Sequence, residues 1–138
     1  MTKACTLSAP KRQRSPKIEP HVPPDQIDPR AIAIGEEMAR ARHFDDHVVR
    51  VVHSPTRWNR SWPNGWRLVF RVDTQRSGFN VDTNSLETRA QSYLFEACIE
   101  EAWLTDPGWK QKWLLKMLEK PGEIAWARRY TDELESLL

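Results

Sequence analysis

Arginine and tryptophan side chains interleave in one stretch of the chain, between residues 57 and 71. A guanidinium group pairs with phosphate or carboxylate through two parallel hydrogen bonds, and an indole ring stacks on nucleic-acid bases. Both residue types are also enriched at the centres of protein interfaces. The stretch therefore predicts a surface for nucleic acid or a protein partner, unless the rings fold back onto their own domain and the arginines are only solvated. The candidate residues are Arg57, Trp58, Arg60, Trp62, Arg67 and Arg71.

A short basic cluster lies near the start of the chain, at Lys11, Arg12, Arg14 and Lys17. Prolines, which interrupt helices, surround it, and apolar residues are too sparse there to form a core. We therefore predict a disordered, proline-rich basic tail over residues 1–28. Its cations are expected to contact the phosphates of nucleic acid or an acidic protein, or simply to keep the tail solvated.

A second group of aromatic residues lies in the last third of the chain, at Trp103, Trp109, Trp113 and Trp126. Their surroundings have the apolar spacing of helices, so one interpretation is that they form an intramolecular core. The other is that some of them line a groove or stripe for a partner helix or for self-association. We take Trp109, Trp113 and Trp126 as this second candidate surface.

Residues that support catalysis or bind metals form no recognisable constellation. His43 and His47 are four residues apart, a spacing that can share a metal ion on a helix, but the glutamate of the zincin pattern is absent. Glycine-rich phosphate loops, nucleophile-elbow serines and Cys-x-x-Cys pairs are absent too. Cys98 falls in an apolar pattern typical of a core residue. We therefore expect no catalytic residue, no metal and no cofactor.

The elements that must hold these residues can be predicted from local patterns. Asp28 as N-cap and Pro29 at the first helical position indicate a helix from residue 29. The β-branched segment 47–53 predicts a buried strand. Residues 66–73 alternate apolar and polar side chains, which predicts a strand with one face on the core and one in water. A turn at residues 74–78 and a short returning strand at 79–81 should follow.

Helices are expected in the remainder of the chain. Asn84 followed by Glu87 resembles a capping box, and apolar residues continue at helical spacing as far as Cys98. Asp106-Pro107 and Lys120-Pro121-Gly122 then separate two more helices. The predicted fold class is α+β: an N-terminal helix, a small antiparallel sheet of two to three strands and three C-terminal helices. They would form one compact domain over residues 29–138, behind the tail.

Composition limits the compartment and the partners. The chain has 138 residues and a net charge of +2, from 21 basic and 19 acidic side chains. Residues 1–60 hold 11 basic and 7 acidic groups, so the positive charge is concentrated at the front. We found no signal-peptide pattern and no apolar run long enough for a bilayer. Cys5 and Cys98 are the only cysteines, and we expect them to stay reduced. These features predict a soluble, cytoplasmic protein without a membrane partner.

Together these patterns predict a non-enzymatic accessory binding protein, of a bacterium or one of its mobile elements. The leading hypothesis is association with nucleic acid, DNA or RNA, through the basic tail and the Arg/Trp surface. The alternative is a protein-binding adaptor or inhibitor that docks on a larger assembly through its tryptophan-rich surfaces. Self-association is compatible with both.

Overall fold

The computed structural model describes residues 22–54 and 59–136. Three α-helices and a four-stranded antiparallel sheet make up this part of the chain, which confirms the predicted α+β class. The order of elements is η1 (Pro24–Gln26, a 3-10 helix), α1 (Pro29–Arg42), β1 (His47–His53), β2 (Arg60–Trp62), β3 (Gly65–Asn80), β4 (Ser85–Glu100), η2 (Glu101–Thr105, a 3-10 helix), α2 (Trp109–Met117) and α3 (Ile124–Ser136).

The first helix begins where the sequence predicts. The Asp28 carboxylate accepts a hydrogen bond of 2.8 Å from the backbone N–H of Arg30, and Pro29 occupies the first helical position. Capping satisfies an amide that has no partner within the helix. The apolar stripe of α1 includes Ile34 and Met38, which are buried against the sheet.

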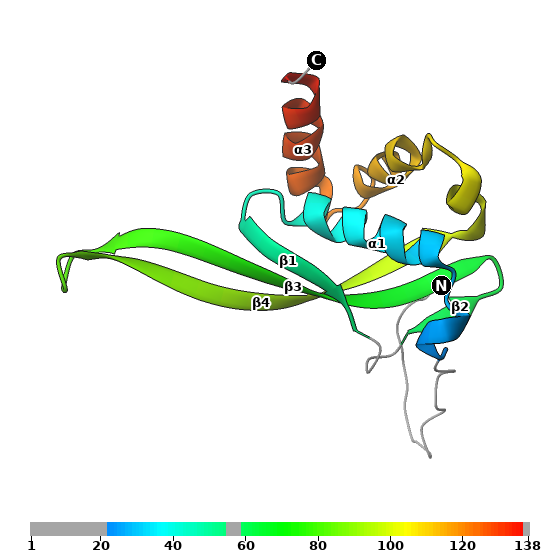
Figure 1. Cartoon of the computed structure of the whole chain (residues 1–138). Helices are drawn as coiled ribbons and strands as arrows, with labels where there is room; N and C mark the ends of the chain where they lie inside the picture. Colours follow the sequence, from blue (N-terminus) through cyan, green and yellow to red (C-terminus); the bar gives the residue numbers. More distant parts are fainter. Residues whose placement is uncertain (1–21, 55–58, 137–138) are drawn as a thin grey trace, which may run out of the picture.

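Strand β3 is the centre of the sheet. β4 pairs with its whole length, from Gly65↔Glu100 to Asn80↔Ser85. Along the opposite edge of β3, β1 pairs with residues 70–75 and β2 with residues 65–67. Beyond Gln75, β3 is accompanied by β4 alone. This two-stranded part, residues 76–89, is called the ribbon below, and it projects away from the rest of the molecule (Figure 1).

The helix predicted to start at Asn84 is wrong, because residues 85–100 form strand β4. Asn84 lies in the hairpin turn with a left-handed φ of 53°, a conformation that asparagine tolerates better than most residues. Glu87 does not cap a helix. Its carboxylate accepts hydrogen bonds from Asn80 Nδ2 at 3.0 Å and Thr83 Oγ1 at 3.1 Å, so it fastens the hairpin turn instead.

Two other details of the prediction also need correction. The strand expected to end at residue 73 continues to Asn80 without the predicted turn at 74–78. Of the three C-terminal helices predicted, two exist as α2 and α3, and η2 is a short 3-10 helix that follows β4 directly. The sheet therefore has four strands rather than two or three.

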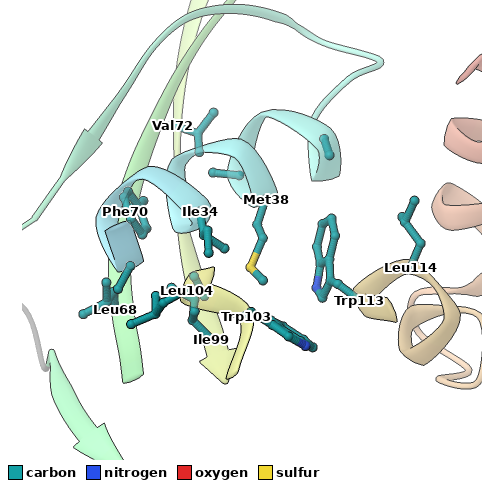
Figure 2. Packing of buried hydrophobic residues seen from close by; sticks show 14 of the residues in the cluster. Ile34, Met38, Leu68, Phe70, Val72, Ile99, Trp103, Leu104, Trp113 and Leu114 are labelled. Carbon is teal, nitrogen blue, oxygen red and sulfur yellow. The ribbon is translucent and has the colours of Figure 1, made fainter. Parts of the chain in front are cut away.

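The core lies between the sheet and a layer of helices. Met38 of α1, Phe70 of β3 and Ile99 of β4 are fully buried, and Trp103 of η2 and Trp113 of α2 close the same cluster. Figure 2 shows Met38 pointing toward these two indoles. The three α-helices all lie on one side of the sheet, and none of those described covers the other side (Figure 1). We call that other side the outer face.

Within the described ranges, no helix is both long enough and apolar enough to cross a membrane.

Candidate nucleic-acid interface

The outer face follows from the alternation of side chains along β3. Leu68, Phe70 and Val72 are buried on the side of α1. Because successive strand residues point to opposite faces, Arg67 and Arg71 must point to the outer face. Residues directly opposite one another in an antiparallel pair share a face, so the register adds members from the other strands. These are Arg50 and Val52 of β1, Arg60 and Trp62 of β2, and Ser92, Leu94, Glu96 and Cys98 of β4.

Two arginines of the outer face are direct cross-strand neighbours. Arg60 of β2 lies opposite Arg67 of β3, an arrangement of like charges that disfavours strand pairing in water. Arg67 Cζ lies 4.4 Å from the centre of the Trp62 ring, so this guanidinium stacks on a half-buried indole. Arg67 Nε is buried and donates to no acceptor in the described part of the chain. The arrangement leaves donor capacity and positive charge beside an aromatic ring.

A second pair of arginines shares a single carboxylate. Arg50 Nε donates to Asp73 Oδ2 at 2.7 Å, and Arg71 Nε donates to Asp73 Oδ1 at 3.1 Å. Ser92 Oγ donates to the same carboxylate at 2.7 Å. The hydrogen bond from Arg50, then that from Ser92 and the weaker effect of Arg71, lower the pKa of Asp73 to about 2. Two guanidinium groups therefore face one carboxylate, and a positive charge is left over.

Basic side chains outnumber acidic ones among the described residues of the outer face. These residues include four arginines, at positions 50, 60, 67 and 71, and the carboxylates of Asp73 and Glu96. Glu100 follows on the same face, but its carboxylate pairs with Lys116 of α2. Exposed apolar side chains, Leu94 and Val52, lie among the arginines. A basic surface with apolar and aromatic members is suited to a polyanion that also has flat apolar parts.

Part of the Arg/Trp surface predicted from sequence lies on the outer face. The structure brings together Arg60, Trp62, Arg67 and Arg71 on one face. The predicted residues Lys11, Arg12, Arg14, Lys17, Arg57 and Trp58 lie outside the described residues. Arg50, which the sequence analysis missed, belongs to the same surface. Its strand was predicted to be buried, yet Val49, Arg50 and Val52 of β1 are exposed, and the pairing with β3 is irregular between Val48 and Arg50. An arginine in the middle of a β-branched run was the signal that one side of this strand faces solvent.

The second candidate surface is largely interior. Trp113 and Trp126 are each only 4% exposed. They belong to a run of ring contacts from Trp103 through Trp109, Trp113 and Trp126 to Tyr130, with neighbouring centroids 5.5–6.4 Å apart. Trp126 Nε1 also donates to Glu123 Oε1 at 2.8 Å. Of the three predicted residues, only Trp109 is half-buried and within reach of a partner.

A groove of about 900 Å³ adjoins the outer face. Its lining includes Trp62 and Arg67 as well as Trp113 and Trp126 from the helical layer. It is lined by four basic and four acidic side chains, and two pairs among them are in contact, Arg42 with Glu123 at 3.1 Å and Lys116 with Glu100. The groove therefore does not concentrate charge of one sign.

Two groups that could take part in catalysis also line this groove. Burial is the main cause that lowers the pKa of His43, and burial raises the pKa of the Cys98 thiol. At neutral pH the imidazole is uncharged and the thiol is protonated, which is unfavourable for a cysteine nucleophile.

Metal-ligating side chains do not gather in the described ranges. His43 Nδ1 lies 3.5 Å from Asp46 Oδ2, and its ring stacks on Tyr93 with centroids 5.0 Å apart. No group of three or more His, Cys, Asp or Glu residues is placed to hold a metal ion within residues 22–54 and 59–136. His43 is positioned by packing and by one carboxylate.

Comparisons of the chain with protein-family models, with curated proteins and with solved structures found no match. The outer face is therefore the feature of this molecule from which a function can be inferred.

Proposed function

We propose that this protein is a non-enzymatic accessory protein that binds nucleic acid through the outer face of its sheet. The observation that carries the proposal is the opposition of Arg60 and Arg67 beside the Trp62 ring. A phosphate beside these two side chains could accept hydrogen bonds from both guanidinium groups. The indole and the exposed Leu94 would contact the flat faces of the bases.

Single-stranded nucleic acid fits this surface better than a duplex groove. Its unstacked bases can lie flat on a sheet that presents aromatic and apolar side chains, and its phosphates can follow a row of arginines. Arg71 and Arg50 extend the row along the face beyond Arg67. The basic residues Lys11, Arg12, Arg14 and Lys17 would add phosphate contacts from the proposed tail.

The alternative of a protein-binding adaptor has less support. It relied mainly on tryptophans offered to a partner, and Trp113 and Trp126 are used inside the protein's own core. The groove beside them has balanced charge. We therefore favour nucleic acid, and an acidic polypeptide becomes a competitor to be tested.

The test is fluorescence anisotropy of labelled oligonucleotides with the full chain, using single-stranded DNA, single-stranded RNA and duplex DNA over a series of salt concentrations. We expect the single strands to bind more tightly than the duplex. Arg60→Gln and Arg67→Gln should each weaken single-strand binding about five- to tenfold at low salt. Each should also reduce the slope of log K against log salt by about 0.7, the contribution of one phosphate contact.

Arg128→Gln is the matched control, because it removes the same charge from an exposed position on α3. It should leave the affinity unchanged within about twofold. Absence of binding to every oligonucleotide at low salt would refute the proposal. Equal binding to polyglutamate would show that the surface recognises negative charge alone, and would favour an acidic protein partner.

A further inference from the structure

The ribbon has a strand edge, that of β4, which is unpaired in the described part of the chain. β4 pairs with β3 in an unbroken register, and in the described part of the chain it pairs with no other strand. Proteins usually block such edges with proline, charged side chains (above all lysine), a bulge, a very short strand or a covering element. Residues 85–91 contain no proline, lysine or bulge, and β4 is 16 residues long. The charged residues of this segment, Glu87 and Arg89, are opposite in sign and so can pair with a second copy. The edge is therefore a ready template for another strand.

The ribbon also exposes apolar side chains at its tip. Phe79 and Leu86 are directly opposite one another and are 59% and 78% exposed. Val81 in the turn is exposed as well. A two-stranded hairpin is only marginally stable in water when it stands alone. Both features are unfavourable for a ribbon that stands alone in water.

The charged residues of the ribbon are arranged unfavourably in the monomer. Arg76 and Arg89 are directly opposite one another, which places like charges side by side. Arg76 donates to Asp46 at 2.9 Å, but Arg89 forms no ion pair with any side chain that the structure describes. Arg89 therefore lacks the carboxylate that would balance it.

We propose that β4 pairs with β4 of a second copy of this chain, antiparallel, about a two-fold axis at Thr88. Each residue before Thr88 is then directly opposite the residue that lies the same number of positions after Thr88 in the partner strand. Glu87 is opposite the partner's Arg89, and Arg89 is opposite the partner's Glu87. Leu86 is opposite the partner's Ala90, and Thr88 is opposite its own copy. In this arrangement Glu87 of each copy supplies the carboxylate that Arg89 of the other copy lacks, so the dimer contains two such pairs.

This self-complementarity favours a second copy over other occupants. A two-fold interface requires that a surface match itself, and the sequence around Thr88 does so in charge and in apolar character. The ribbon carries two arginines, Arg76 and Arg89, and two carboxylates, Asp82 and Glu87. Its net charge is therefore zero, so it offers little electrostatic attraction to nucleic acid. The paired segment, residues 85–91, is short, so the dimer should depend on concentration.

The pairing would place the two outer faces on the same side of one continuous sheet. Residues 86, 88 and 90 point to the outer face in both copies, because opposite residues of an antiparallel pair share a face. The dimer itself does not depend on the proposed function. It depends only on the edge of β4 and on Glu87, Thr88 and Arg89.

Sedimentation velocity of the nuclease-treated full chain at low salt, over a series of protein concentrations, tests the proposal by charge reversal. Glu87→Arg and Arg89→Glu each place like charges opposite one another at two symmetry-related points. We expect each to weaken dimerisation about tenfold or more. The double variant Glu87→Arg/Arg89→Glu restores opposite charges across the axis and should dimerise more strongly than either single variant, although it too loses the hydrogen bonds that Glu87 accepts from Asn80 and Thr83. An equimolar mixture of the two single variants should form a heterodimer, because each carries the charge that the other lacks.

Arg128→Glu, on α3, is the matched control and should not affect dimerisation. Circular dichroism of every variant checks that the sheet is retained. A chain that remains monomeric at the highest concentration would overturn the proposal. So would dimerisation that is indifferent to the single reversals, or single variants whose mixture fails to associate. None of these outcomes bears on oligonucleotide binding by the outer face, so the two proposals can fail separately.

Discussion

Arg67 of β3 stacks on Trp62 of β2, with the guanidinium carbon 4.4 Å from the ring centre. The contact joins the short strand β2 to the centre of the sheet, and it holds an indole beside positive charge on the outer face. Trp62 is therefore both a packing residue and the stacking platform of the proposed interface.

Replacement of Trp62 by alanine should weaken single-strand binding by about 1–3 kcal/mol, the usual value of one stacked base. Replacement by phenylalanine should retain part of this affinity, because a smaller ring still stacks. Anisotropy titrations at one salt concentration measure the difference. Leu115→Ala, at an exposed apolar position on α2, serves as the control. Equal affinity of the alanine variant and the unchanged chain would remove Trp62 from the interface.

Asp73→Asn should strengthen binding to nucleic acid. The Asp73 carboxylate forms ion pairs with both Arg50 and Arg71. Its removal leaves these two guanidinium groups available to phosphate. We expect affinity at low salt to rise severalfold and the slope of log K against log salt to become steeper. Asp132→Asn, which removes a carboxylate from an exposed position on α3, controls for net charge. Unchanged or weaker binding by Asp73→Asn alone would contradict a role for this part of the face.

The same carboxylate should make stability depend on pH in the acid range. The pKa of Asp73 is lowered to about 2, chiefly by Arg50 and Ser92. A carboxyl group whose pKa is lower in the folded state stabilises the fold above its unfolded pKa of about 3.9 and ceases to do so as pH falls toward 2. Urea midpoints at pH values between about 5 and 2 should therefore decrease less steeply for Asp73→Asn than for the unchanged chain. If the urea midpoints of the two proteins decreased in parallel with pH, Asp73 would not contribute to the loss of stability in acid.

Asn59 should be among the most sensitive positions in the chain. It is fully buried, its Oδ1 accepts from the backbone N–H of Val69 at 2.6 Å, and its Nδ2 donates to the carbonyl of Ser54 at 2.8 Å. Asn59→Ala leaves both backbone groups without partners, at about 1–3 kcal/mol for each one left buried. We expect a loss of about 2–4 kcal/mol in the free energy of unfolding, measured by urea denaturation. A loss below about 0.5 kcal/mol, the usual scale of surface substitutions, would mean that water replaces the side chain.

Gly35 of α1 lies tightly against Phe70 and Ala97 of the sheet. A methyl group there would overlap the ring of Phe70, which is fully buried and has no room to turn away. Gly35→Ala should therefore destabilise the fold by about 1–3 kcal/mol, despite the better helix propensity of alanine. Gly122→Ala, where nothing lies near the added group, should change stability little. The effect of Gly35→Ala should shrink in a Phe70→Leu background, and equal effects in both backgrounds would mean that the ring is not the obstacle.

Local signals were sufficient where the deciding interaction was local. The Asp28 cap and Pro29 fix the start of α1 without reference to the rest of the chain. The alternation in residues 66–73 assigned Arg67 and Arg71 to a solvent-facing side, and the structure keeps both on the outer face.

Residues 85–100 form a strand because of contacts with residues that are distant in the sequence. Leu86, Ala90 and Ala97 fit a helical period, and nothing near them shows that β3 pairs with the segment along its full length. The turn adds to the difficulty, because Asn84 and Glu87 are as suitable for a hairpin as for a capping box. The structural role of Asn59 could not be predicted from sequence, because its side chain hydrogen-bonds two backbone groups on other segments, those of Ser54 and Val69.

The sheet is supported unevenly along its length. Near the helices, β3 has a neighbour on each side, whereas past Gln75 it keeps only β4. Backbone amides of the inner portion lie between paired strands beneath the helical layer, so their exchange with deuterium requires an opening whose free energy approaches that of unfolding the domain. Those of the distal portion need only a local fraying of two strands. We therefore expect the backbone amides of β3 to exchange slowly near the helices and rapidly in the ribbon. The twist of the ribbon can then change while the inner part of the sheet keeps its shape.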